Sequence, residues 1–259
     1  MKRALSPKPA RAPEQMAGLQ KGLAAIEAFG TSRGALTLTE VADFIGSSRP
    51  AARRCLLTLL NLGYAAEDGR YFRLAPRVLR LGQAYVSSSP LPRTVQPIIE
   101  AACERTRESI SVAVLDDSEV IVIARALVRR SLSAGLGVGS RLPAYCSANG
   151  RVLLSTLSDK DLEALLVRMP RPRLTPKTIT EPNRILREIR LVRTRGYAIN
   201  DQEVETGLRT IAIALRDKSG AEIASISQSV ADSTSPLDEI VAQRLPELQA
   251  IRNQVAGML

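Results

Sequence analysis

Apolar residues near the start of the chain recur at helical spacing. Between residues 19 and 29 they fall every three or four positions, which predicts a helix that ends near Gly30. A second, shorter helix is predicted after Thr37 or Thr39, because either hydroxyl can cap it. Glu40 stands three residues after Thr37, as in a capping box. The chain is therefore expected to open with two short amphipathic helices.

A turn and a third helix follow directly. Gly46 supplies the turn, and Ser48 can cap a helix that tolerates Pro50 in its first turn and runs to about Leu62. One face of this helix is apolar, and the other carries Arg49, Arg53, Arg54, Thr58 and Asn61. Two helices joined by a glycine turn, the second with an arginine-rich exposed face, are typical of a helix-turn-helix.

Short strand-like runs around Asp68-Gly69 predict a β-hairpin between residues 64 and 74, the wing of a winged helix-turn-helix. Arginine in the major groove can bond guanine through two hydrogen bonds, whereas a wing-tip arginine such as Arg70 holds phosphate. The DNA-binding candidates are Ser47, Ser48, Arg49, Ala51, Arg53, Arg54 and Arg70. A three-helix packing module with a solvated basic face is the alternative.

The distribution of charge favours a polyanionic partner for this first unit. The 259 residues include 36 Lys and Arg against 26 Asp and Glu, a net charge of +10. Residues 1–88 hold 13 basic and 6 acidic residues, and residues 89–259 hold 23 and 20, so the balance is +7 against +3. A small basic unit followed by a larger, nearly neutral one is typical of a nucleic-acid-binding domain joined to a domain with another task.

Absent residue types exclude several classes of enzyme and metal site. The chain has no His, which excludes Ser-His-Asp and Cys-His catalysis and histidine-ligated zinc. Its cysteines, Cys55, Cys103 and Cys146, form no CxxC pair, so a structural zinc cage is excluded and reduced thiols are expected. No run of about 18 apolar residues occurs. We expect a cytoplasmic protein without a metal, a cofactor or a membrane span.

The second unit interleaves strand-like and helical segments after a Ser-Pro-rich break at residues 87–92. Strands are predicted at 109–115, 120–126, 131–138, 197–200, 210–216 and 222–230, and helices at 94–107, 148–157, 159–167, 183–194 and from Pro236 onward. The lack of a regular βαβ rhythm favours an α+β fold with an antiparallel sheet. The expected divisions are a disordered basic tail at 1–16, a winged helix-turn-helix at 17–76, a linker helix at 77–92 and a second domain at 93–259.

Motifs in both units resemble the IclR family of bacterial transcription regulators. They are LTEVA at 38–42, ARRCLLTL at 52–59, RGYAINDQE at 195–203, GLR at 207–209 and IASISQS at 223–229. The stretch VGSRLPAYC at 138–146 further resembles the branch that regulates breakdown of aromatic acids through β-ketoadipate. The resemblance spans roughly Ala17 to the end of the chain.

The resemblance implies a winged helix-turn-helix joined by a helix to an effector-binding domain of GAF-like α/β shape. It implies dimers or tetramers that bind palindromic operators in double-stranded DNA and respond to a small carboxylic acid. The family's effector cavity corresponds here to Ala148, Asn149, Asn200, Thr210, Ser227 and Ser229. Ser227 and Ser229 alternate on one strand, so both hydroxyls share a face and can cradle a carboxylate with the helix that follows Asn149.

Two further residues complete the predicted effector site. Arg141 is a candidate countercharge, because a guanidinium pairs a carboxylate through two hydrogen bonds, and Tyr145 is a candidate for stacking on an aromatic ligand. A structural ion pair or exposed charge is the alternative for Arg141, and a core aromatic is the alternative for Tyr145. Other members often have an acidic residue where Asn200 stands and a thiol where Thr210 stands, so the effector need not be the small keto acid that some members bind.

The predicted function is a sequence-specific transcription regulator that responds to a small aromatic or dicarboxylic acid. One alternative is an architectural DNA-binding protein without an effector, whose binding would depend on salt but not on sequence. Another is a hydrolase that uses Cys146 or Ser147 with carboxylates such as Asp201 and Glu203. No base of suitable pKa is evident for either nucleophile, so no catalytic residue is assigned.

Overall fold

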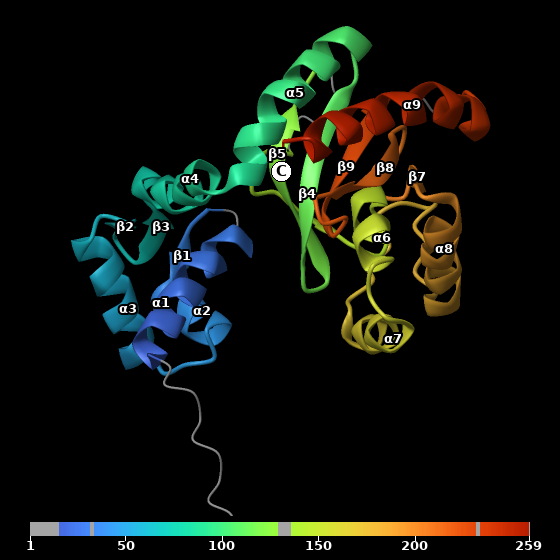
Figure 1. Cartoon of the computed structure of the whole chain (residues 1–259). Helices are drawn as coiled ribbons and strands as arrows, with labels where there is room; N and C mark the ends of the chain where they lie inside the picture. Colours follow the sequence, from blue (N-terminus) through green and yellow to red (C-terminus); the bar gives the residue numbers. More distant parts are fainter. Residues whose placement is uncertain (1–15, 32–33, 129–135, 232–233, 259) are drawn as a thin grey trace, which may run out of the picture. The chain divides into compact units, whose positions relative to one another are not determined.

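The computed structural model of the chain describes residues 16–31, 34–128, 136–231 and 234–258. The chain forms two compact units, the first ending at Ala84 and the second starting at Tyr85 (Figure 1). The tail expected at 1–16 lies outside the described residues except for Met16, and so does most of the strand expected at 131–138. The described part of that segment forms no strand, and the edge strand of the sheet begins at Arg141 instead.

The first unit packs short helices on a small antiparallel sheet. Its elements are α1 (Ala17–Ala28), η1 (Phe29–Thr31), β1 (Leu36–Thr37), α2 (Leu38–Phe44), α3 (Arg49–Asn61), β2 (Ala65–Asp68), β3 (Tyr71–Leu74) and η2 (Pro76–Val78), followed by α4 (Leu79–Ser88). The strand order is β1-β3-β2, and β2 and β3 form the predicted hairpin. Val41, Leu56 and Phe72 join α2, α3 and β3 in one core. The helix-turn-helix prediction is confirmed, with α2 and α3 as its helices.

The signals that predicted the starts of α2 and α3 act differently. Thr37 and Glu40 form the predicted capping box: the Thr37 hydroxyl accepts from the Glu40 backbone N–H at 3.4 Å, and the Glu40 carboxylate accepts from the Thr37 backbone N–H at 2.7 Å. Hydrogen bonds from the backbone and the hydroxyl of Thr37 lower the pKa of Glu40. Ser48 precedes α3, but within the described structure its side chain makes no capping hydrogen bond, so only its position was predicted correctly.

The second unit is an antiparallel sheet with helices on both faces. Its elements are α5 (Pro90–Thr106), β4 (Ser109–Asp116), β5 (Glu119–Ala126), β6 (Arg141–Pro143), α6 (Ala148–Leu154), α7 (Asp159–Arg168), α8 (Pro182–Arg195), β7 (Ala198–Asp201), β8 (Arg209–Arg216), β9 (Glu222–Val230) and α9 (Leu237–Ala256). The strand order is β6-β5-β4-β9-β8-β7, and every neighbouring pair is antiparallel. The predicted α+β fold with an antiparallel sheet is confirmed.

Helix α5 begins earlier than the sequence suggested. It starts at Pro90 and includes Pro92, so Ser89 alone separates it from α4. Proline is tolerated in a first turn because the N–H groups there have no partner within the helix. The Ser-Pro-rich stretch therefore marks the start of a helix rather than an extended break.

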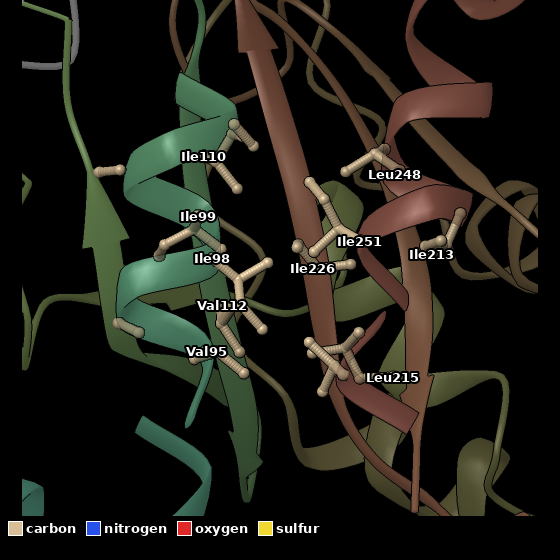
Figure 2. Packing of buried hydrophobic residues seen from close by; sticks show 14 of the residues in the cluster. Val95, Ile98, Ile99, Ile110, Val112, Ile213, Leu215, Ile226, Leu248 and Ile251 are labelled. Carbon is tan, nitrogen blue, oxygen red and sulfur yellow. The ribbon is translucent and has the colours of Figure 1, made fainter. Parts of the chain in front are cut away.

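The two faces of the sheet differ in chemistry. Ile110, Ile213 and Ile226 point to one face, where α5 and α9 cover them and form an apolar core (Figure 2). On the other face Ala148 of α6 packs with Ala212 of β8, close to serine and threonine side chains of the same strands. Because successive side chains of a strand point to opposite faces, each central strand serves both the core and this polar face.

Helix α6 lies very close to the segment that precedes it. A Cβ on Gly150 would lie 2.2 Å from the carbonyl oxygen and 2.3 Å from the Cα of Ala144. Both are backbone atoms of a fully buried residue, so they cannot move aside as a flexible side chain would. Glycine at this position is therefore required for the chain to fold back from Ala144 onto the first turn of α6.

We expect Gly150→Ala to lower the free energy of unfolding by about 3 kcal/mol, because the added methyl group overpacks a buried turn. Urea denaturation followed by circular dichroism measures the change. Gly30→Ala is the matched control, since its Cβ would meet nothing within 4 Å and the residue is exposed; it should stay within about 1 kcal/mol of the parent. A Gly150→Ala midpoint equal to that of the control would show that the turn has room.

Candidate functional site

The polar face of the sheet borders a cavity in the second unit. Its lining residues are Ser111, Val122, Arg125, Leu136, Leu142, Ser147, Ala148, Asn149, Asn200, Val204, Leu208, Thr210, Ser227 and Ser229. About 50 Å³ of it is open to the centres of water molecules. One water needs about 10–15 Å³ by this measure, so the cavity has room for roughly four waters or one small ligand.

The residues that family resemblance suggested for an effector site come together here. Ala148, Asn149, Asn200, Thr210, Ser227 and Ser229 all line this cavity, although they come from α6, β7, β8 and β9. The sheet register explains the grouping, because Asn200 pairs with Thr210 and Thr210 pairs with Ser229 across neighbouring strands. Cross-strand partners share a face, so their side chains lie side by side.

The serine and threonine hydroxyls on this face already have short-range partners. Thr210 Oγ1 and Ser229 Oγ lie 3.0 Å apart and share a hydrogen bond. Ser227 Oγ donates to the Ser111 carbonyl oxygen at 3.5 Å, at the limit of a hydrogen bond. A hydroxyl can both donate and accept, so these groups keep capacity for a polar ligand.

The start of α6 forms one wall of the cavity. Ser147 caps the helix, since its hydroxyl accepts from the Gly150 backbone N–H at 3.2 Å. Asn149 is only 6% exposed and lines the cavity. Its side-chain Oδ1 is buried and accepts no hydrogen bond from any residue that the structure describes. This wall therefore presents a polar acceptor without a protein partner.

Asn200 lines the cavity but has a structural role. Its Nδ2 donates to the Cys146 carbonyl oxygen, and its Oδ1 accepts from the Glu203 backbone N–H at 3.2 Å. Both ends of the amide are thus used to hold β7 against the turn before α6. We therefore assign Asn200 to the wall of the cavity rather than to ligand recognition.

The sequence analysis missed Arg125, which supplies the cationic side chain among the described lining residues. Arg125 lies on β5 and pairs with Ser111 of β4, which in turn pairs with Ser227 of β9. Burial lowers the pKa of its guanidinium, and the charge of Glu205 opposes this shift. A charged residue within the apolar run 120–126 was the signal that could have identified it.

The structure contradicts the roles suggested for Arg141 and Tyr145. Arg141 lies on edge strand β6, where its guanidinium is 2.6 Å from Glu119 and 2.7 Å from Asp116, and it does not line the cavity. Tyr145 is fully buried and donates its hydroxyl to the Pro172 carbonyl, so it is a core aromatic. The alternative stated for each residue is the correct one.

A buried ion pair supports the cavity from behind. Arg151 of α6 and Glu203 have side chains that are 1% and 5% exposed, and two hydrogen bonds of 2.6 and 2.8 Å join them. Arg151 also donates to the carbonyls of Tyr145 at 3.0 Å and Ile199 at 3.2 Å. Glu203 accepts from the Ile179 backbone N–H at 3.0 Å. The pair thus fastens α6, β7 and the segment before α8 together.

The groups of the hydrolase alternative have structural roles instead. Burial raises the pKa of the Cys146 thiol to about 12, so the thiolate is not available near neutral pH. Burial also acts to raise the pKa of Asp201, but hydrogen bonds from Lys177, Arg209 and Gln202 outweigh it and lower the pKa to about 2. Glu203 is held by Arg151, as described above. No pair of nucleophile and base exists among these side chains.

The helix-turn-helix presents part of its predicted contact surface to solvent. Ser48, Arg49, Arg53, Arg54 and Arg70 are exposed, and Ser47 is partly buried. Arg49 and Arg53 are four residues apart on α3 and share one face. Arg54 borders a hollow between α3 and α1. Ala51 borders the same hollow and is 7% exposed, so the expectation that it faces a DNA groove is wrong.

Wing residue Arg70 is held in place by its neighbour. Its guanidinium lies over the Tyr71 ring, 5.0 Å from the ring centroid, and donates to the Tyr71 hydroxyl at 2.8 Å. Within the described ranges no helix is long and apolar enough to cross a membrane, and no cluster of side chains could hold a metal ion.

Comparisons with known proteins identify both units. A family model described as "Bacterial transcriptional regulator IclR C-terminal" matches residues 83–256, and one described as "IclR helix-turn-helix domain" matches residues 18–69. The "Pca regulon regulatory protein" of Pseudomonas putida is 38% identical, over 95% of this chain and 85% of its own length. The "p-hydroxybenzoate hydroxylase transcriptional activator" of Acinetobacter baylyi is 36% identical, over 96% of this chain and 94% of its own.

A solved structure is similar to the second unit. It is the inducer-binding domain of the Acinetobacter transcription factor PobR, a double mutant in complex with 3-hydroxybenzoic acid. It is 28% identical, covers 66% of this chain and 100% of its own, and superposes with a TM-score of 0.61.

We expect Glu203→Gln to lower the free energy of unfolding by about 3–5 kcal/mol, because Arg151 would remain buried without a countercharge. Chemical denaturation of the full chain measures the loss. Glu119→Gln is the control: its partner Arg141 has a side chain 45% exposed, so the loss should stay below about 1 kcal/mol. Equal losses for the two variants would contradict a special role for the buried pair.

Proposed function

The chain belongs to the IclR family of bacterial transcriptional regulators, and on that premise we propose that it responds to a monocyclic aromatic carboxylic acid bound in the cavity of the second unit. The aromatic-acid branch, expected from its motifs, agrees with the names of its relatives. Those names describe regulators of a pca regulon and of p-hydroxybenzoate hydroxylase.

The observation that carries the proposal is the position of Arg125 in the cavity. A carboxylate entering the cavity replaces its hydration with the Arg125 guanidinium and the hydroxyls of neighbouring strands, including Ser111 and Ser227. Charge-assisted hydrogen bonds of this kind are about twice as strong as neutral ones. The partly buried position strengthens the attraction further, since water screens it less.

The rest of the lining favours a ring over a second carboxylate. Apolar side chains occupy much of the wall: Val122, Leu136, Leu142, Val204 and Leu208. Arg125 is the one cationic side chain among the described lining residues, so a dicarboxylate would leave one charge without a partner at a high desolvation cost. The complex of the PobR domain with 3-hydroxybenzoic acid supports the same class of ligand.

On the first unit we propose that the exposed face of α3 lies in the major groove of an operator. Arg49 and Arg53 are the candidates for base contacts, together with Ser47 and Ser48 at the start of the helix. Arg54 lies toward α1 and Arg70 on the wing, so both are better suited to phosphate. Phosphate contacts fix the register, and base contacts supply the sequence preference.

We further propose a homo-oligomer, dimer or tetramer, that acts in the cytoplasm on a palindromic operator. The support is an apolar surface on the first unit, where Leu19, Leu23, Leu79 and Leu81 are all exposed in the single chain. Such a surface is costly to leave in water and suits a second copy of the chain. Two-fold symmetry of the protein then matches two-fold symmetry of the DNA site.

The architectural alternative assigns no role to the polar cavity. It predicts DNA binding that changes with salt but not with sequence or with added acids. The measurements below distinguish it from the regulator, because each compares operator with random DNA or one acid-binding variant with another.

We expect Arg125→Met to weaken binding of 4-hydroxybenzoate and of benzoate about 10- to 100-fold, since a charge-assisted hydrogen-bond pair is lost. Isothermal titration calorimetry on the full chain measures both affinities. Arg141→Met is the matched control, because Arg141 pairs with Asp116 and Glu119 outside the cavity and should leave both affinities unchanged. A larger loss in the control would return the countercharge to Arg141.

We expect Arg53→Ala to abolish the preference for operator over random DNA while weak binding to both remains, because a base contact supplies about 1–3 kcal/mol of discrimination. Fluorescence anisotropy on the DNA upstream of the protein's own gene measures this. Arg70→Ala should instead weaken binding to both DNAs alike and reduce the salt dependence by about one phosphate contact. Equal losses on both DNAs for Arg53→Ala would refute its role in base contact.

A further inference from the structure

The buried amide of Asn149 carries an inference about which aromatic acid the cavity selects. Asn149 is the second residue of α6, is 6% exposed and lines the cavity. Its Oδ1 is buried and has no hydrogen-bond partner among the residues that the structure describes. A buried acceptor without a partner is costly to leave unsatisfied, so it suggests a group that arrives with a ligand.

Asn200 shows that an amide in the same wall can be satisfied by the protein. Its Nδ2 donates to the Cys146 carbonyl and its Oδ1 accepts from the Glu203 backbone N–H. Asn149 has the same functional group a few ångströms of chain away from Cys146, and its acceptor has no such backbone partner in the described structure. The two asparagines therefore differ in role: Asn200 builds the wall, and Asn149 faces the cavity with its acceptor available.

Asn149 and Arg125 belong to different borders of the cavity. Asn200 ties the turn before α6 to edge strand β7, whereas Arg125 lies on β5, and β4, β9 and β8 run between these two strands. Neighbouring strands are about 4.8 Å apart, so the backbones of β5 and β7 are separated by roughly 19 Å. A ligand held by the Arg125 guanidinium at one end therefore meets Asn149 toward its other end, with the apolar wall along its ring.

We propose that Asn149 accepts a hydrogen bond from a hydroxyl on the ring of the bound acid, and so selects hydroxylated aromatic acids over the unsubstituted acid. This inference rests on the proposed function, because it takes the acid's carboxylate to lie at Arg125. A hydroxyl supplies the missing donor, whereas a bare ring edge leaves Oδ1 buried and unsatisfied. Sites built to bond a substrate hydroxyl reject the analogue that lacks it strongly for this reason.

The test compares acids that differ in the donor alone. Isothermal titration calorimetry on the full chain uses benzoate, 3-hydroxybenzoate, 4-hydroxybenzoate and 4-methoxybenzoate. The methoxy compound keeps the ring oxygen and removes its proton, so it separates donation from size and polarity. We expect one hydroxybenzoate to bind at least tenfold more tightly than both benzoate and the methoxy acid.

Variants then assign the preference to Asn149. In Asn149→Leu, which has a similar size and no acceptor, the affinity for the preferred hydroxybenzoate should fall until its ratio to benzoate is within about threefold. Asn149→Ala should reduce the ratio in the same way and serves if the leucine variant does not fold by circular dichroism. Asn183→Leu is the matched control, because Asn183 is also the second residue of a helix, α8, but is exposed and outside the cavity lining.

The outcomes separate this inference from the proposed function. Equal binding of all four acids by the parent protein, or a hydroxyl preference that survives in both Asn149 variants, would overturn the role of Asn149 and leave the aromatic-acid effector in place. Binding of none of the acids would overturn the proposed effector class, and this inference with it. A preference that disappears in the Asn149 variants and persists in Asn183→Leu would establish it.

Discussion

The cavity of the second unit keeps its shape because a buried ion pair stands behind it. Removing two charges from water costs several kcal/mol for each, so Arg151 and Glu203 stay buried only because two hydrogen bonds join them and backbone groups satisfy their remaining positions. Those backbone groups belong to the turn before α6, to β7 and to the segment before α8. Asn149 and Asn200 lie on two of these segments, so the cavity lining depends on a contact that no ligand touches.

The close approach of α6 at Gly150 and the alternation of the sheet complete this arrangement. Isoleucines of the central strands pack under α5 and α9, and this core holds the sheet rigid from one side (Figure 2). Residues between them on the same strands, such as Ser227 and Ser229, are thereby forced to the opposite face. A polar cavity can exist there because the free energy of the fold comes mainly from the apolar side.

Arginines in this protein differ in role because their surroundings differ. Arg141, on an edge strand, pairs with two exposed carboxylates and contributes little. Arg151 is fully buried and structural. Arg125 lines the cavity, where a carboxylate ligand can reach it. Arg53 points to solvent from α3, where DNA can reach it. Residue type alone does not distinguish these four.

The sequence by itself determined the local elements and much of the site. Helical spacing and the Thr37–Glu40 capping box predicted α2, and the motifs brought Thr210, Ser227 and Ser229 into one expected cavity. Both signals are local, since they depend on neighbouring residues or on alternation along one strand. Only the tertiary structure showed that Arg125, and not Arg141, enters the cavity, and that Glu203 pairs with Arg151. Those contacts depend on strand register and burial between segments far apart in the chain, and no local periodicity records which distant partner a charged side chain will meet.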